Sequence, residues 1–297
     1  MQTFKHKLFI LGCLILLLSC LLIILPAKQN HNTICVSCKS YEDEILAELV
    51  TILIEHKTPY TVKRHYNLGS TFMTFNALKA NDIDLYPEYT GTIIYGILDS
   101  THMPKEPIAF IKKGLEKYQL DTQLFFGFSN SYVICVTKAF AQTHNIKTLS
   151  DLKTYTQNHP FKVGMDAEFI ARQDYTNLIT AYDLQWNPIL MDSGLLYLNL
   201  TSNELDFIVA NELDDEIKRF DLYILEDDKE AMPPYESLLL TKKDLFQKYP
   251  ELEDTLALLE NQISKEEYQA LNANLRNSQA DLHDVALTFL KEKGIIY

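Results

Sequence analysis

The sequence predicts an α/β protein made of two successive units. Short β-favouring runs alternate with segments in which apolar residues recur at helical spacing, and this alternation starts again at about residue 149. The chain has 297 residues, which is enough for one large or two ordinary domains. Repeated strand and helix indicate a mostly parallel sheet that is covered on both faces.

The first unit is predicted to contain three strands and three helices. Its expected strands are 33–37, 60–66 and 83–86, and its expected helices are 43–56, 72–80 and 107–118. In sheets of this type, ligands bind beyond the carboxyl ends of the strands. The loops that follow the first and third strands, 38–42 and 86–92, are therefore candidates for ligand contacts.

The second unit repeats the pattern at smaller size. Strand-like runs at 125–128 and 132–137 are separated by Ser129-Asn130-Ser131 and lead into it. The expected helices are then 149–155, 171–182 and 195–201, and the expected strands are 161–165, 189–191 and 207–210. About 80 residues are a plausible size for a small domain.

The C-terminal part is predicted to be a helical tail that packs back on the first unit. A strand is expected at 238–240, and after it Leu252, Leu256 and Leu259 fall at i, i+4 and i+7. Ser264 and Glu267 have the spacing of a capping box.

The division that we expect has four segments. Residues 1–30 form a leader, 31–129 and 212–297 form the first unit, and 130–211 form the second unit. The chain then crosses between the units near residues 129 and 211.

The leader is a basic start followed by an apolar run. Lys5, His6 and Lys7 precede Leu8–Leu25, a pattern typical of an export signal or a single membrane anchor. Leu17-Leu18-Ser19-Cys20 resembles a bacterial lipoprotein cleavage box, in which the cysteine is lipidated, and an uncleaved anchor is the alternative. Both interpretations predict a body that lies outside the cytoplasm and is tethered to a membrane.

Composition and motifs argue against several classes of function. The formal charge of −13 and the dispersed lysines give no basic stripe for nucleic acid. The sequence has no G-x-S-x-G, H-E-x-x-H, G-x-x-x-x-G-K or G-x-G-x-x-G, and its histidines have no metal-ligand spacing. We therefore expect no enzyme activity, no cofactor and no metal site.

Cys35-Val-Ser-Cys38 has the spacing of a thiol-redox motif, so a thiol oxidoreductase is a competing hypothesis. However, the motif falls in a predicted strand and not at a helix N-terminus. Small apolar strand residues are the interpretation we favour.

The stretch Asp82–Thr92, Asp-Ile-Asp-Leu-Tyr-Pro-Glu-Tyr-Thr-Gly-Thr, is the strongest candidate for a functional segment. It places two aromatic rings, a proline, a glycine and two hydroxyls directly after a predicted helix and strand. Pro87 disfavours helix at Tyr86, and Gly91 permits backbone conformations that a side chain resists. Tyr89 and Thr92 are thus expected on an exposed turn or at a helix start, where ligand contacts are common.

With these motifs, residues 34–297 resemble the substrate-binding proteins of ABC importers for glycine betaine, choline, carnitine and related quaternary amines. The supporting motifs are Tyr86-Pro-Glu-Tyr-Thr-Gly-Thr92, Cys38-Lys-Ser-Tyr-Glu, Phe128-Ser-Asn-Ser-Tyr132, Phe169-Ile-Ala-Arg-Gln-Asp174 and Met232-Pro-Pro-Tyr235. Their order along the chain also matches that family. The resemblance implies a two-lobed, periplasmic-binding-protein-like fold of type II, with the ligand cleft between the lobes and an ABC permease as partner.

The resemblance also implies residue roles. Tyr89, Tyr132 and Tyr197 would be walls of an aromatic cage, Thr92 a hydrogen-bond donor, and Lys39 with Arg172 the partners of a ligand carboxylate. A quaternary ammonium has no N–H to donate, so aromatic faces attract it electrostatically at about 0.5–2 kcal/mol each.

The chain departs from the family pattern at Asn211, where many members have a further cage tyrosine. An amide there can hydrogen-bond a polar ligand body. We therefore expect a ligand bulkier than glycine betaine, such as carnitine or ergothioneine. Glu44 adds a negative charge near the predicted cleft entrance. The alternative function is a membrane-anchored sensor domain with the same fold.

Overall fold

The structure is a computed structural model that describes residues 32–278 and 280–297. The predicted leader, with its apolar run and Cys20, lies outside the described residues. Among those that are described, no helix is long and apolar enough to span a bilayer.

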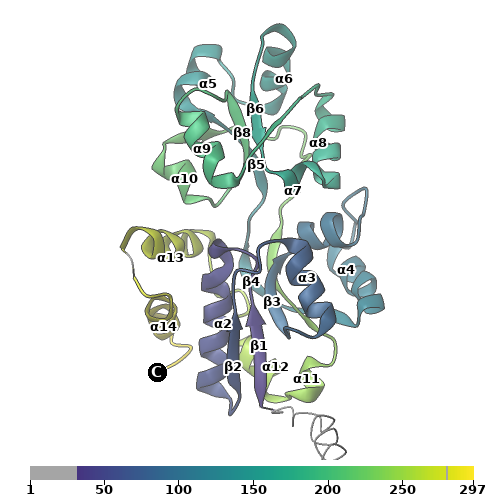
Figure 1. Cartoon of the computed structure of the whole chain (residues 1–297), viewed down its shortest axis with the longest axis vertical. Coiled ribbons are helices and arrows are strands. Elements are labelled where there is room, and N and C mark those ends of the chain that lie inside the picture. Colours follow the sequence, from purple (N-terminus) through teal and green to yellow (C-terminus); the bar gives the residue numbers. More distant parts are fainter. Residues whose placement is uncertain (1–31, 279) are drawn as a thin grey trace, which may run out of the picture. The chain divides into compact units, whose positions relative to one another are not determined.

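The first sheet has five strands in the order β2-β1-β3-β10-β4, of which Figure 1 labels all but β10. These strands are β1 (Thr33–Ser37), β2 (Thr61–His65), β3 (Leu85–Tyr89), β4 (Leu120–Ser129) and β10 (Glu236–Lys242). β1 and β3 are parallel, whereas β10 is antiparallel to both β3 and β4. The sheet is thus mixed, because a strand from the C-terminal part of the chain is inserted between β3 and β4.

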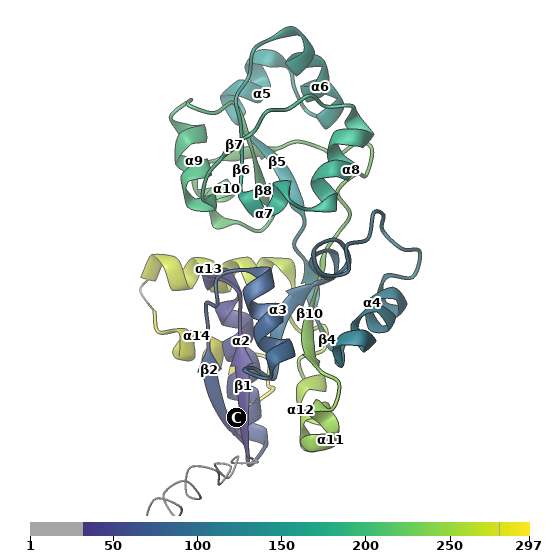
Figure 2. The same ribbon diagram turned by 45° about the vertical axis from the view of Figure 1, so that its right-hand side comes forward.

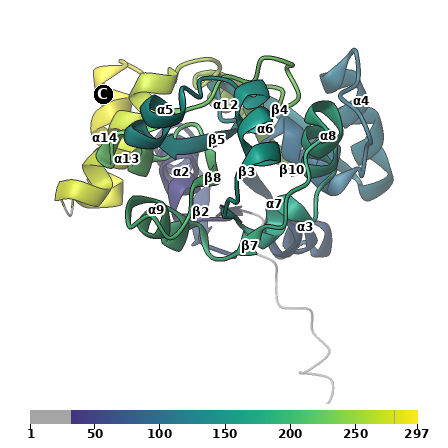
Figure 3. The same cartoon turned by 90° about the horizontal axis from the view of Figure 1, so that it is seen from above.

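Helices cover both faces of this sheet, as the sequence predicts. Seen from above, α13 and α14 lie on the side opposite to α3 and α4 (Figure 3). The helical elements of this part are η1 (Tyr41–Asp43), α2 (Glu44–Lys57), α3 (Thr71–Ala80), η2 (Thr92–Ile97), α4 (Pro107–Leu115), η3 (Glu116–Tyr118), α11 (Leu245–Lys248), α12 (Glu251–Ala257), α13 (Lys265–Ser278) and α14 (Leu282–Glu292). The capping box predicted before α13 is confirmed, since Ser264 and Glu267 exchange side-chain to backbone hydrogen bonds.

The second sheet has five strands in the order β7-β6-β8-β5-β9. These are β5 (Tyr132–Thr137), β6 (Val163–Met165), β7 (Ile189–Leu190), β8 (Phe207–Asn211) and β9 (Leu222–Ile224). Its helices are α5 (Lys138–His144), α6 (Leu149–Asn158), α7 (Ala167–Ile170), α8 (Gln173–Tyr182), α9 (Ser193–Thr201) and α10 (Asp215–Arg219). Figure 2 shows α9 and α10 on one side of this sheet and α8 on the other.

Alternating residues of β5 divide the second core into two layers. Ile134 and Val136 pack with α6 and α8, and Cys135 packs with α9. This period of two is what a strand covered on both faces requires. The first sheet has its own, larger apolar core, so each sheet packs around a core of its own.

The chain crosses between the sheets twice. Asn130 and Ser131 connect β4 to β5. After β8, the chain forms β9, which pairs with β5, and then re-enters the first sheet at β10. The backbone N–H of Asn130 donates to the carbonyl of Tyr235 at 3.0 Å, so the two crossing segments are directly bonded. The lobe limits 31–129, 130–211 and 212–297 stay a prediction.

Gly127, within β4, offers a test of this packing. Its φ is +115°, and a Cβ would lie 2.9 Å from the Cα of Asn261 and 2.9 Å from the carbonyl oxygen of Ile263. We expect Gly127→Ala to lower the free energy of unfolding by about 2 kcal/mol or more, measured by urea denaturation. Gly194→Ala is the control, because a Cβ there meets nothing within 4 Å. Equal stability of the two variants would contradict the expectation.

Candidate functional site

Arg172 is the centre of a buried cluster that joins residues from both sheets. Arg172 directly precedes α8, and the whole residue is only 7% exposed to solvent. Nε and Nη2 donate to Asp174 at 3.0 and 2.9 Å, and Nη1 donates to Thr92 Oγ1 at 3.4 Å. The guanidinium carbon lies 5.3 Å from the ring centroid of Tyr132 and 5.7 Å from that of Tyr235. We call these five residues the arginine cluster.

The arginine cluster brings together three residues that the sequence predicts for the site. Thr92 begins η2, which follows β3, Tyr132 begins β5, and Arg172 is the residue directly before α8. Thr92 thus belongs to the part of the chain that forms the first sheet, and Tyr132 and Arg172 belong to the part that forms the second. The ring of Tyr132 also lies 4.5 Å from that of Phe169, centroid to centroid.

Tyr235 and Asp174 were missed as site residues, although both end motifs that carry the resemblance. Tyr235 follows two prolines directly before β10, and its hydroxyl donates to Asp174. Its ring packs against Gly91, where a Cβ would lie 1.9 Å from Cε1. The signal was therefore in the sequence, since Met232-Pro-Pro-Tyr235 and the glycine of the Tyr86–Thr92 motif belong to one contact.

A second group, the Tyr89 cluster, lies at the carboxyl ends of β1 and β3. The hydroxyl of Tyr89 donates to Asp43 Oδ1 at 3.0 Å. Lys39 Nζ lies 5.3 Å from the centroid of the Tyr89 ring and donates to Glu88 Oε1 at 2.6 Å. The ring of Phe128 meets Tyr89 edge-on, with centroids 6.5 Å apart. Lys39 and Tyr89, both predicted for the site, are therefore neighbours, but Tyr89 is buried and does not lie on an exposed turn.

Burial dominates the electrostatics of the Tyr89 cluster. It raises the pKa of the Asp43 carboxyl to about 6, while Lys39 opposes the shift and Glu88 adds to it. The hydroxyl of Tyr86 and the Glu88 carboxyl are also buried here, and the Glu88 carboxyl adds to the effect of burial in raising the pKa of Tyr86.

Asn211 and Tyr197 occupy different places. Asn211 is directly opposite Tyr132 in the pairing of β5 with β8, so both side chains lie on one face of the second sheet. Tyr197 is 3% exposed and packs with Leu196, Leu200 and Ile208 on α9 and β8. Its hydroxyl donates to Asp214, which also accepts the backbone N–H of Asn211 at 3.1 Å. Tyr197 thus reaches Asn211 through Asp214, and its role as a cage wall stays a prediction.

The cysteines of the described chain do not form a reactive centre. Cys35, Cys38 and Cys135 are free thiols. Burial raises the pKa of Cys38 to about 12, whereas a reactive cysteine needs a lowered pKa. Nor do the described residues contain a group of three or more His, Cys, Asp or Glu side chains that could hold a metal.

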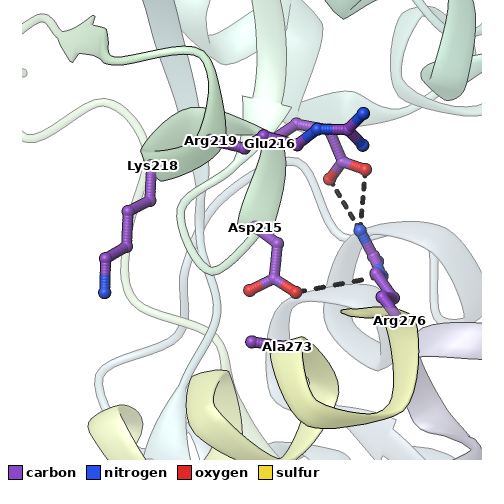
Figure 4. A pocket seen from close by; sticks show the side chains of 6 residues that line it. All are labelled: Asp215, Glu216, Lys218, Arg219, Ala273 and Arg276. Atoms are coloured by element: carbon purple, nitrogen blue, oxygen red, sulfur yellow. Dashed lines mark hydrogen bonds and ion pairs between the residues drawn. The ribbon is translucent and has the colours of Figure 1, made fainter. Parts of the chain in front are cut away.

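A pocket away from the arginine cluster lies between α10 and α13 (Figure 4). It is lined by Asp215, Glu216, Lys218, Arg219, Ala273 and Arg276. Arg276 Nη1 pairs with Glu216 at 2.7 Å, so charges that line this pocket already compensate one another. It contains no aromatic wall and none of the residues that the sequence predicts for the site.

Two α/β sheets joined by two crossings, with a polar and aromatic cluster drawn from both, define a two-lobed solute-binding protein. Residues 34–292 match the family described as the substrate binding domain of the ABC-type glycine betaine transport system, and the chain belongs to this family. Its members are solute-binding components of importers and not enzymes. They act outside the cytoplasm, which agrees with the location predicted from the sequence.

Curated relatives support this assignment. The carnitine transport binding protein OpuCC of Listeria monocytogenes is 32% identical over 260 residues, which cover 85% of this chain and 84% of the relative. The ergothioneine transport permease/ergothioneine binding protein EgtU of Helicobacter pylori is 32% identical over 289 residues, or 95% of this chain and 52% of that protein.

Solved structures agree on the fold. A crystal structure described as a glycine betaine/carnitine/choline ABC transporter has a TM-score of 0.71 and 29% identity, and the match covers 88% of this chain and 99% of that chain. Lactococcal OpuAC in its closed form with glycine betaine has a TM-score of 0.64 at 15% identity, over 89% of this chain and 96% of that chain, which supports the fold alone.

The raised pKa of Asp43 predicts a specific dependence of stability on pH. The pKa lies near 6 in the folded protein, against an ordinary value of 3.8, so Asp43 contributes stability that is present below about pH 4 and lost as the pH rises through about 6. Asp43→Asn cannot titrate. We expect the free energy of unfolding of the wild type, relative to this variant, to fall by roughly 1–3 kcal/mol between pH 4 and pH 7. Urea unfolding at several pH values measures this, and a constant difference would contradict it.

Proposed function

We propose that the protein binds a quaternary ammonium compound in an aromatic cage and delivers it to an ABC permease. The observation that carries the proposal is the arginine cluster, in which the rings of Tyr132 and Tyr235 both lie within 6 Å of a cation. Faces that attract a guanidinium attract a trimethylammonium group for the same electrostatic reason. Tyr89 and Tyr197 are the further proposed walls.

We infer that the carboxylate of a zwitterionic ligand meets the basic residues of the site. Nε and Nη2 of Arg172 donate to Asp174. The ligand's carboxylate would therefore contact Nη1, beside the hydroxyl of Thr92. Lys39 is the second proposed carboxylate partner. Its ammonium is already paired with Glu88, as Arg172 is with Asp174, so a ligand carboxylate would share Lys39 with Glu88.

We further propose a ligand bulkier than glycine betaine, of the carnitine or ergothioneine type. Relatives named for carnitine and for ergothioneine, each 32% identical, support this choice. Asn211 supports it too, because its amide lies beside Tyr132, where another aromatic side chain would narrow the cage.

The membrane tether belongs to the same proposal. The basic and apolar leader supports a lipidated Cys20 or an uncleaved anchor, either of which would keep the protein close to its permease.

Calorimetric titration tests the binding function directly. Glycine betaine, choline, carnitine and ergothioneine are titrated into the purified protein, with proline as the non-quaternary control. We expect micromolar or tighter binding of at least one quaternary amine, and about tenfold weaker binding to Tyr132→Leu, which keeps an apolar side chain but loses the aromatic face. Tyr155→Leu, at a partly buried aromatic residue on α6 that has no predicted role in the site, is the control variant. Failure of every amine on folded protein would remove the proposal.

Asn211→Tyr tests the choice of ligand. An added aromatic wall should favour the small trimethylammonium head, so we expect glycine betaine to gain about three- to tenfold in affinity relative to the bulkier amines. The measurement is the ratio of the dissociation constants of glycine betaine and of carnitine, determined for the wild type and for the variant. Tight wild-type binding of glycine betaine without preference for larger betaines would contradict the proposed ligand class.

A further inference from the structure

A carboxylate of the chain itself contacts the edge of Arg172 that Asp174 leaves open. Glu168 Oε1, from α7, lies 3.7 Å from Arg172 Nη1. The same oxygen accepts a hydrogen bond of 2.6 Å from Thr71 Oγ1, at the start of α3. Since α3 packs with the first sheet and α7 with the second, Glu168 connects groups from both sheets.

The geometry of Arg172 makes this contact consequential. A guanidinium presents its donors in a fixed plane, and Nε and one N–H of Nη2 donate to Asp174. Nη1, which does not contact Asp174, has Thr92 Oγ1 at 3.4 Å as its hydrogen-bond acceptor. A ligand carboxylate that approaches Nη1 therefore arrives beside Glu168.

The exposure of the three groups differs in an informative way. The side chain of Arg172 is 6% exposed and Thr71 is buried, whereas the side chain of Glu168 is 40% exposed. Nη1 and the Thr71 hydroxyl are fixed donors, and Glu168 has room to move away from them. Two carboxylates cannot both occupy this place without strong repulsion at low dielectric.

We propose that Glu168 is a specificity-determining residue that competes with the ligand's carboxylate for Arg172 Nη1 and the Thr71 hydroxyl. The inference rests on the proposed function and deepens it. Glu168 lowers the affinity for quaternary amines that carry a carboxylate, relative to those that do not. In an amine with a long body, the carboxylate lies far from the ammonium head, and contacts between the body and the protein offset the repulsion between Glu168 and the ligand's carboxylate.

A purely structural role predicts something different. If Glu168 only bridges the two sheets, its removal weakens binding of every amine by a similar factor, because all of them use the same arrangement of the lobes. The change in preference between ligands therefore separates the two roles.

The experiment compares ligands that differ at the carboxylate. Glycine betaine, carnitine, ergothioneine and choline are titrated calorimetrically into the wild type, Glu168→Gln and Glu168→Ala, and thermal unfolding shows that each variant is folded. Glu204→Gln is the matched control, because Glu204 also lies in the second lobe and also makes a 3.7 Å ion pair, with Lys162 at the surface. We expect both Glu168 variants to bind the carboxylate amines about five- to tenfold more tightly, with no gain for choline and no change in Glu204→Gln.

Three results would overturn the proposal. They are a similar change for choline and the carboxylate amines, no gain for the carboxylate amines, or the same gain in Glu204→Gln. If the folded wild type binds none of the four amines, the proposed function itself fails, and this outcome is distinct from the other three.

Discussion

The buried ion pair between Arg172 and Asp174 is the interaction on which the arrangement of the site depends. Taking a guanidinium out of water is costly, and the cost is offset only when its donors and its charge are all compensated. Here two N–H groups meet the carboxylate, and two aromatic rings face the cation. Asp174 in turn accepts the Tyr235 hydroxyl. A residue of α8 is thereby bonded to the segment that returns to the first sheet.

This dependence explains the small residue in the Tyr86–Thr92 motif. The ring of Tyr235 can approach the backbone of that segment only because residue 91 has no side chain. Thr92, the next residue, then lies within reach of Arg172. The motif, the diproline segment before Tyr235 and the arginine segment are therefore one structural unit, although they are far apart in the sequence.

The fold could be predicted largely from the sequence because its signals are local. Periodicity gave the α/β class, and the restart after residue 149 gave the second sheet. The place of β9 in the second sheet could not be read in this way, since β9 is short and belongs to that sheet only through its pairing with β5. The insertion of β10 between β3 and β4 is equally non-local. Pairing partners are set by the tertiary structure and leave no periodic signal.

The candidate site was predictable where a motif carried it and unpredictable where a partner was needed. Thr92, Tyr132 and Arg172 do converge, whereas the partner of Arg172 was missed because an acid two residues further on looks like any surface charge.

The charges around Tyr89 bear on where a cation can bind. Lys39 is flanked there by two buried carboxylates, Asp43 and Glu88, and burial already opposes ionisation of Asp43. A positive group placed against the Tyr89 ring would relieve this imbalance. The charges around Tyr89 therefore support the proposal that this ring is one wall of the cage.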